Sequence, residues 1–378
     1  MNIVKENSPH LRRPASVTRM MADVLIALAP TLILSFIVYP INTLIFYVIS
    51  LAIMIGAEFI YVGLRNMMPA DGQKHSFKER FKYAYKDQHF NQNNVLSAAI
   101  SAVIFTLIMP AGAPIYAVII GALVGIIFGK LVFGGLGSNI FNPAVVGMVF
   151  AKLCFGSQYV KYVDTWFYNA PDVAAGPTFL SGGLSSTLDN FVNNMNYYSL
   201  GDMFFGRIPG TLGEVYKLTI LVGMVYLLVR RSADWRIMAS YFGTFIFLSL
   251  IVGLSVYGLN NNVNPGLFTL YSLLSGGVLF GGVFMLTDPV TSPINSPSRV
   301  MYGMIAAVAT VFIRFLAALP EGVAFSILIA NMVACVLDHY EWSSSRYTYK
   351  KIIGMVCLIV LPALILFLSI FYGGVYNG

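Results

Sequence analysis

Apolar stretches long enough to cross a lipid bilayer recur along most of this 378-residue chain. A spanning helix needs roughly 20 mainly apolar residues, and in hydrocarbon only helices or closed barrels satisfy every backbone polar group. Eleven stretches meet or approach that length, near residues 21–39, 41–63, 95–110, 114–133, 141–156, 214–230, 237–257, 270–286, 300–318, 322–338 and 351–374. We therefore expect an all-α polytopic membrane protein with 10–11 spans.

The long polar segment 157–213 separates five predicted spans from six. This division predicts two five-helix repeats, residues 1–156 and residues 214–340. The segment 157–213 is then a loop outside the membrane, and residues 341–378 supply one additional C-terminal helix.

Lysine and arginine side chains gather on one side of this topology. They occur at the N-terminus, in the 64–94 loop and after the fourth, sixth, eighth and tenth spans, whereas the 157–213 segment holds only Lys161 and Arg207. Cytoplasmic loops are enriched in basic residues, so the N-terminus and the 64–94 loop are expected in the cytoplasm. In this interpretation Lys130, which follows the fourth span, is one of the cytoplasmic charges, and the net charge of +7 reflects topology.

Two short glycine-rich segments resemble each other across the two halves. FGGLGSNIFNPAVVG occupies residues 133–147 and FGGVFMLTDPVTSP occupies residues 280–293. In each, a polar residue precedes a proline: Asn142 in the first and Asp288 in the second. Matching interruptions in two halves point to broken spans around a site near the centre of the membrane. The alternative is a pair of tight turns that only connect helices.

Several ionisable residues fall within the apolar spans, where a charge usually faces the bundle interior, a partner or a pathway. Asp23 and Asp338 are near predicted span ends and can reach the interface, whereas Glu58 and Arg314 are deeper. For Glu58 and Arg314, a structural role in an ion pair and a role in ion transport are both open. We take Glu58 and Asp288 as candidates for an ion pathway. The full set is Asp23, Glu58, Glu214, Lys217, Arg314 and Asp338.

Other chemistries find no support in the sequence. The three cysteines and four histidines are scattered, without the spacing of a disulfide scaffold or a metal site. No Walker loop, HExxH or GxSxG sequence is present, which argues against nucleotide-driven and hydrolytic reactions.

The glycine-rich segments, together with other blocks, resemble the RnfD/NqrB family of ion-motive redox complexes. The blocks include SPHLRRPASVTRMMADVLIALAP, GKLVFGGLGSNIFNPA, FFGRIPGTLGE and GGVFMLTDPVTSP, and they keep their order over about residues 8–340. The short N-terminus and the PEGVAF block favour the RnfD branch over the quinone-reducing NqrB branch.

This resemblance implies an electron-transfer subunit of an ion-translocating ferredoxin:NAD oxidoreductase of the Rnf type. It implies a multi-pass protein of a prokaryotic plasma membrane. The implied partners are the flavin-carrying G-type, the iron–sulfur B- and C-type and the membrane A- and E-type subunits. Alternatives are an NqrB-like subunit of a sodium-pumping quinone reductase, a channel or secondary transporter without redox chemistry, and a purely structural membrane subunit.

The resemblance also implies FMN, joined through its phosphate to a threonine of the external loop. In SGGLSSTLDNF, Thr187 falls on the attachment position, with Thr178 as a weaker alternative. The sequence departs from the family pattern: Ser181 stands for an aspartate, Ser186 for an alanine, and no proline follows Thr187. An ordinary serine- and glycine-rich surface loop is the competing interpretation.

A second, noncovalent flavin, riboflavin, is implied within the membrane part. We expect it against Asn142 and Asp288, with Gly134 and Gly135 allowing the backbone to approach the ring closely. The basic stretch 74–92 and the eleventh helix have no counterpart in the ten-span family pattern, and no function is assigned to either.

Overall fold

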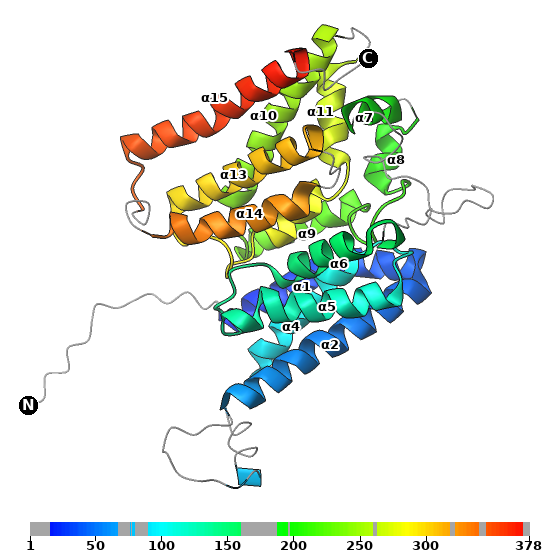
Figure 1. Ribbon diagram of the computed structural model, residues 1–378, viewed down its shortest axis with the longest axis vertical. Helices are drawn as coiled ribbons and strands as arrows, with labels where there is room; N and C mark the ends of the chain where they lie inside the picture. The colour runs from blue at the N-terminus through cyan, green and yellow to red at the C-terminus, as the bar shows by residue number, and fades with distance from the viewer. Residues whose placement is uncertain are drawn as a thin grey trace, which may run out of the picture.

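The computed structural model describes residues 16–66, 76, 78–79, 90–159, 187–195, 197–259, 263–317, 322–339 and 345–372. Within these ranges the chain is helical, without a β-strand apart from one isolated bridge between Pro110 and Thr211. An N-terminal and a C-terminal group of helices lie one beside the other (Figure 1), and α1 packs against α9 where the groups meet.

The first group follows the first five predicted spans. Its helices are α1 (Val17–Val38), α2 (Pro40–Asn66), α4 (Gln92–Ile108), α5 (Ile115–Gly129) and α6 (Pro143–Tyr159). The side chain of Ser16 accepts a hydrogen bond from the Arg19 amide at 3.2 Å and so caps α1. Pro40 opens α2, where its missing N–H is no loss.

Two short helices connect the groups. They are α7 (Thr187–Met195) and α8 (Leu200–Phe205). Phe191 of α7 is buried, with its ring centroid 4.8 Å from that of Phe268 and 5.7 Å from that of Phe315. Aromatic contacts of this kind hold α7 firmly against the second group.

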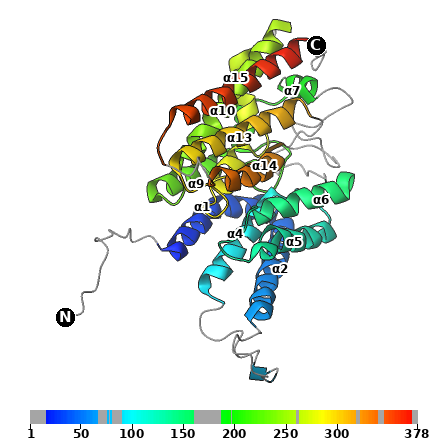
Figure 2. The ribbon, with the colours of Figure 1, turned by 60° about the vertical axis from the view of Figure 1, so that its left-hand side comes forward.

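The second group contains the remaining spans and a bend. Its elements are α9 (Lys217–Arg230), α10 (Trp235–Leu259), α11 (Pro265–Leu274), α12 (Val278–Phe280), the π-helix η2 (Gly281–Met285), α13 (Ser296–Phe315), α14 (Gly322–Leu337) and α15 (Tyr349–Tyr372). The chain bends by 65° between α11 and the α12–η2 unit. α15 packs against α10 and α13 at the outer side of this group (Figure 2).

Every predicted span coincides with a helix or with the bent pair, which confirms the all-helical polytopic fold. Six described helices are long and apolar enough to cross a membrane, and the bent pair raises this to seven. Helices α4, α6 and α14 are apolar but shorter. The protein is therefore a multi-pass membrane protein with both long and short apolar helices.

The glycine-rich segments differ from the expected pair of broken spans. The first is a connection: after the 3-10 turn η1 (Leu131–Phe133), a loop leads to Pro143 at the start of α6. The second forms η2 itself, and the break in that span lies just before it, at residues 275–277. The two segments thus converge on one region with different local structures.

A row of glycines brings α5 unusually close to α6. Gly121, Gly125 and Gly129 recur every four residues on the face of α5 that meets α6. A Cβ atom on Gly125 would lie 2.5 Å from the carbonyl oxygen of Pro143, and one on Gly147 would lie 2.4 Å from that of Gly121. Small residues at this spacing let membrane helices pack backbone to backbone, and here they fix both ends of the 130–142 connection.

Candidate functional site

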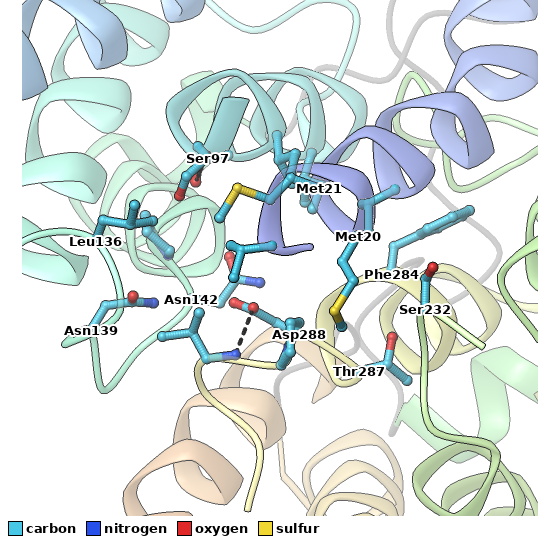
Figure 3. Close-up of a pocket in the computed structure, with 18 of the residues that line it drawn as sticks. Met20, Met21, Ser97, Leu136, Asn139, Asn142, Ser232, Phe284, Thr287 and Asp288 are labelled. Carbon is cyan, nitrogen blue, oxygen red and sulfur yellow. Dashed lines mark hydrogen bonds between the residues drawn. The ribbon is translucent and has the colours of Figure 1, made fainter. Parts of the chain in front are cut away.

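A cavity of about 330 Å³ lies where the two helix groups meet. Its walls come from α1, α4, the connection between α5 and α6, the end of α9, and the segment that follows η2. Figure 3 shows its lining, with Met20 and Met21 from α1 and Phe284 from η2 among the apolar side chains. The polar lining is small and varied: Ser97, Ser101, Lys130, Asn139, Asn142, Ser232, Thr287 and Asp288.

Asn142, from the first glycine-rich segment, lines this cavity and is almost completely buried. Its Oδ1 atom accepts a hydrogen bond from the Ala144 amide at 3.1 Å, and Pro143 occupies the first helical position of α6. This is the preferred chemistry of a helix start. The Asn-Pro pair therefore has a structural role that also holds the amide of Asn142 in the cavity wall.

Asp288, from the second segment, lines the same cavity (Figure 3). Its Oδ1 atom accepts a hydrogen bond from the Val290 amide at 3.1 Å, which closes an Asx turn around Pro289. Burial raises the pKa of the Asp288 carboxyl above its ordinary value, while the Val290 amide and the charge of Lys130 act in the opposite direction. The structure thus brings Asn142 and Asp288 together from segments far apart in the sequence.

Lys130, which lines the cavity, forms a buried ion pair with Glu58, which is not among the lining residues. The Nζ atom of Lys130 lies 2.5 Å from Oε2 of Glu58 and donates a further hydrogen bond to Oγ of Ser97 at 2.9 Å. Both charged side chains are only 1% exposed. Two opposite charges persist in such surroundings because each compensates the other.

A second polar network closes the side of the cavity formed by α1 and α9. The carboxylate of Asp23 accepts hydrogen bonds from Ser232 Oγ at 2.6 Å, Tyr226 Oη at 3.2 Å and Arg230 Nε at 3.1 Å. Asp23 is 3% exposed, because these partners from α9 and the residues after it enclose its carboxylate. The network joins the two helix groups.

Gly134 and Gly135 lie in the same connection but are not among the residues that line the cavity. Both have left-handed backbone angles, with φ of 118° and 88°, which glycine adopts at little cost. Nη1 of Arg65 donates a hydrogen bond to the Gly134 carbonyl at 2.7 Å, and the Tyr61 ring approaches Gly135. These glycines shape the turn against α2, while Gly137 is the glycine of this segment that lines the cavity.

A third group of charges surrounds the bend between α11 and α12. Arg314 donates hydrogen bonds to the carbonyl oxygens of Ser272 and Ser275, and Lys217 donates to that of Gly276 at 2.8 Å. The two cations are almost completely buried and satisfy carbonyl groups that the end of α11 leaves without helical partners. Lys217 and Arg314 therefore have a structural role, because each binds backbone carbonyl oxygens directly. Glu214 lies beside Gly277 in the same group.

The other expected residues are spread more widely. Thr187 is the first residue of α7; its side chain and residues 160–186, which include Thr178, lie outside the described residues. Asp338 accepts a hydrogen bond from the Ile294 amide at 3.0 Å, away from the cavity. Among the described residues, no group of histidine, cysteine and acidic side chains could hold a metal ion.

Lys130 is the functional candidate that sequence reasoning missed. Its place after a span suggested a cytoplasmic surface charge, yet the structure buries it against Glu58. Arg299 and Arg230, attributed to the same basic surface, also form ion pairs, with Asp234 and Asp23. The sequence did contain a signal for this ion pair, because a glutamate deep in an apolar span needs a cation.

Comparison with known proteins adds a family to this geometry. The chain is 36% identical over 216 residues to the B-type subunit of the Na(+)-translocating NADH-quinone reductase of Chromohalobacter salexigens, covering 57% of this chain and 50% of that protein. The corresponding protein of Ectopseudomonas mendocina is 36% identical over 218 residues, covering 57% and 52%. That of Pseudoalteromonas atlantica is 32% identical over 221 residues, covering 58% and 53%. The chain thus spans about half the length of the curated relatives it matches.

A family model covers more of the chain. The model described as the NQR2, RnfD, RnfE family matches residues 4–347, which include the first helix group and the second group as far as α14, whereas α15 lies beyond the match. The resemblance noted in the sequence is thereby confirmed, and the protein belongs to the NQR2, RnfD, RnfE family.

Proposed function

We propose that this chain is a flavin-carrying electron-transfer subunit of an ion-translocating oxidoreductase complex of the Rnf type. The observation that carries the proposal is the shared cavity: Asn142 and Asp288 line one enclosed space at the junction of the helix groups. The family resemblance supports the choice of flavin, and the G-, B-, C-, A- and E-type subunits that it implies are the proposed partners.

The cavity suits a planar heterocycle with one polar edge. Its volume of about 330 Å³ is within the usual range for small-molecule sites, which are mostly apolar with a few placed polar groups. Met20, Met21 and Phe284 supply apolar walls, and Asn139 and Asn142 supply amide groups that both donate and accept hydrogen bonds. These residues fit riboflavin as the noncovalent cofactor.

Riboflavin, when bound, supplies the one- and two-electron chemistry that no side chain here provides. The protein residues position and tune it. The ammonium group of Lys130 favours negative charge in the cavity, and the carboxyl of Asp288 limits how much negative charge gathers there. The methionines and Phe284 keep water from the apolar part of the site.

For the second flavin we propose phosphoester attachment of FMN to Thr187. Its support is the match of Thr187 to the family's attachment position. α7, which begins at Thr187, packs through Phe191 against the end of α13. Glu58 and Asp288 remain our candidates for the ion pathway, with the 157–213 segment outside and the N-terminus in the cytoplasm.

The experiment is flavin extraction from the purified protein under denaturing conditions. We expect one flavin released as riboflavin and one retained on the chain as a fluorescent band. The Thr187→Val variant should lose the band while keeping the extractable flavin, and Thr178→Val is the matched control that should keep both. A colourless wild-type protein would refute the flavin proposal. A band lost in Thr178→Val instead would move the attachment site.

The ion pathway has a separate test. Glu58→Gln and Asp288→Asn should each reduce ion transport in proteoliposomes more than they reduce assembly of the complex. Transport at the wild-type rate in both variants would leave these carboxylates with structural roles only.

A second candidate, an NqrB-like subunit of a sodium-pumping quinone reductase, is favoured by the names of the relatives. The purified complex separates the two: reduction of a quinone by NADH supports the NqrB-like assignment. Reduction of NAD by ferredoxin supports the Rnf type.

A further inference from the structure

The cation that neutralises Glu58 is part of the protein itself. Lys130 reaches Glu58 from the end of α5, 72 positions later in the chain, through a short charge-assisted contact of 2.5 Å. Ser97 of α4 provides the second oxygen around the ammonium group, at 2.9 Å. Two separate segments, α2 and α4, therefore contribute oxygen atoms to one small cation shell, and the ammonium group of Lys130 occupies it.

This shell is incomplete on the side of Glu58. The Oε1 atom of Glu58 is buried and has no hydrogen-bond partner within the part of the chain that the structure describes. A buried carboxylate oxygen normally has a partner, so the site offers one more oxygen than the ammonium uses. Carboxylate and hydroxyl oxygens are also the ligands that hard metal cations prefer.

Lys130 has a second acidic neighbour across the cavity. Among the described residues that line the cavity, only Lys130 and Asp288 carry ionisable acid or base groups. The charges of the two attract each other, in addition to the attraction between Lys130 and Glu58. The lysine side chain is a point charge on a flexible four-carbon stem, so an ammonium group in this position can be drawn toward either carboxylate.

We propose that Lys130 is an internal counter-cation that exchanges with a monovalent metal cation at Glu58. In the resting state its ammonium group occupies the cation shell, as the structure shows. When Lys130 turns toward Asp288, or toward other negative charge in the cavity, Glu58 and Ser97 receive the metal cation in its place. The three charges of Glu58, Lys130 and Asp288 then sum to zero together with the metal ion.

The exchange gives the ion pathway a gate, since Glu58 binds a cation only after Lys130 has left. Its use in transport rests on the function proposed above, whereas cation binding at Glu58 is a property of this chain alone. The two can therefore fail separately.

The test is thermal unfolding of the full-length chain in lipid nanodiscs, in NaCl or in choline chloride at equal ionic strength. The Lys130→Met substitution leaves Glu58 without its cation, so the unfolding midpoint of this variant should lie below that of the wild type in choline chloride. The midpoint of the variant should rise by several degrees as NaCl replaces choline chloride, because a cation that binds only the folded state stabilises that state. The wild type should respond little.

The matched control is the double variant Glu58→Gln/Lys130→Met, which lacks both charges and should show no response to sodium. An equal response of the double and single variants would overturn the proposal. So would a midpoint of Lys130→Met that rises on acidification but ignores sodium, because Glu58 would then take a proton rather than a metal ion.

Lys130→Arg provides a variant that keeps the charge and hence the compensation of Glu58. A guanidinium group binds a carboxylate with two parallel hydrogen bonds and is less easily drawn away. We expect sodium uptake into proteoliposomes of the complex to fall at least about tenfold while assembly of the complex is unchanged. Uptake at the wild-type rate in this variant would also overturn the exchange.

Discussion

Substitution of Gly125 by alanine tests how strongly the α5–α6 contact supports the cavity. The added Cβ atom would lie 2.5 Å from the Pro143 carbonyl oxygen, 3.0 Å from the Gly147 Cα atom and 3.1 Å from the Gly147 nitrogen. All three neighbours are backbone atoms, so no side chain can rotate away. The two helices must separate by several tenths of an ångström or more.

The magnitude follows from two opposing effects. Alanine in place of a helical glycine gains roughly 1 kcal/mol of helix propensity. Forcing an extra carbon into a closely packed contact costs roughly 1–3 kcal/mol. Because the clash at Gly125 involves backbone on the other helix, we expect the second effect to exceed the first. The net loss is then up to about 2 kcal/mol of unfolding free energy.

The assay is thermal unfolding in nanodiscs, with Gly243→Ala as the matched control. Gly243 is also inside a long helix, α10, but a Cβ atom there would meet nothing within 4 Å. Gly243→Ala should leave the midpoint unchanged or raise it, whereas Gly125→Ala should lower it and weaken retention of the noncovalent flavin. Equal midpoints for Gly125→Ala and the wild type would refute the reasoning.

Three further predictions concern the charged groups and the topology. Asp23→Asn weakens a carboxylate that accepts three hydrogen bonds, so unfolding free energy should fall by roughly 1–3 kcal/mol; an unchanged denaturation midpoint contradicts this. Burial raises the pKa of Asp288 in the folded state, so the stability that depends on its neutral form should be lost as pH rises from about 4 through the raised pKa, where the carboxyl becomes an anion. Asp288→Asn lacks this loss, so its midpoint relative to the wild type should increase with pH, and parallel pH curves would contradict the assignment. Single cysteines at Asn190 and Lys82 should react with impermeant reagents from opposite sides of the membrane; labelling from one side would overturn the predicted topology.

The helices could be predicted from the sequence because hydrophobic length is a direct requirement of the bilayer. All eleven predicted stretches became helical elements, including the short ones. The bend was harder to place. The bend lies before Gly277, where Lys217 and Arg314, from other helices, donate hydrogen bonds to the carbonyl oxygens of residues 272, 275 and 276. Nothing within the span itself shows where such distant donors will lie.

The candidate cavity could be predicted only in part. Asn142 and Asp288, each of which precedes a proline, line one cavity, and in both the side-chain oxygen accepts a hydrogen bond from the amide two residues later. The role of Lys130 could not be obtained by the same reasoning. Counting basic residues by loop treats each as solvated, and burial of one of them depends on a tertiary contact 72 positions away.

α9 connects the two regions of buried charge, and this gives the proposed electron path a physical scale. Its first residue, Lys217, binds the bend, and Leu227 near its other end lines the cavity. Ten residues of α-helix rise about 15 Å, so the bend and the cavity are separated by roughly that length of closely packed protein. α7 packs by Phe191 against Phe315, next to Arg314 of the bend. A carrier attached at the start of α7 would therefore lie on the far side of the bend from the cavity, and the buried cations would stand between the two proposed flavin positions. A positive charge fixed in that place would lower the energy of an electron that passes it, so under the proposed function the bend would be part of the electron path as well as a break in a span.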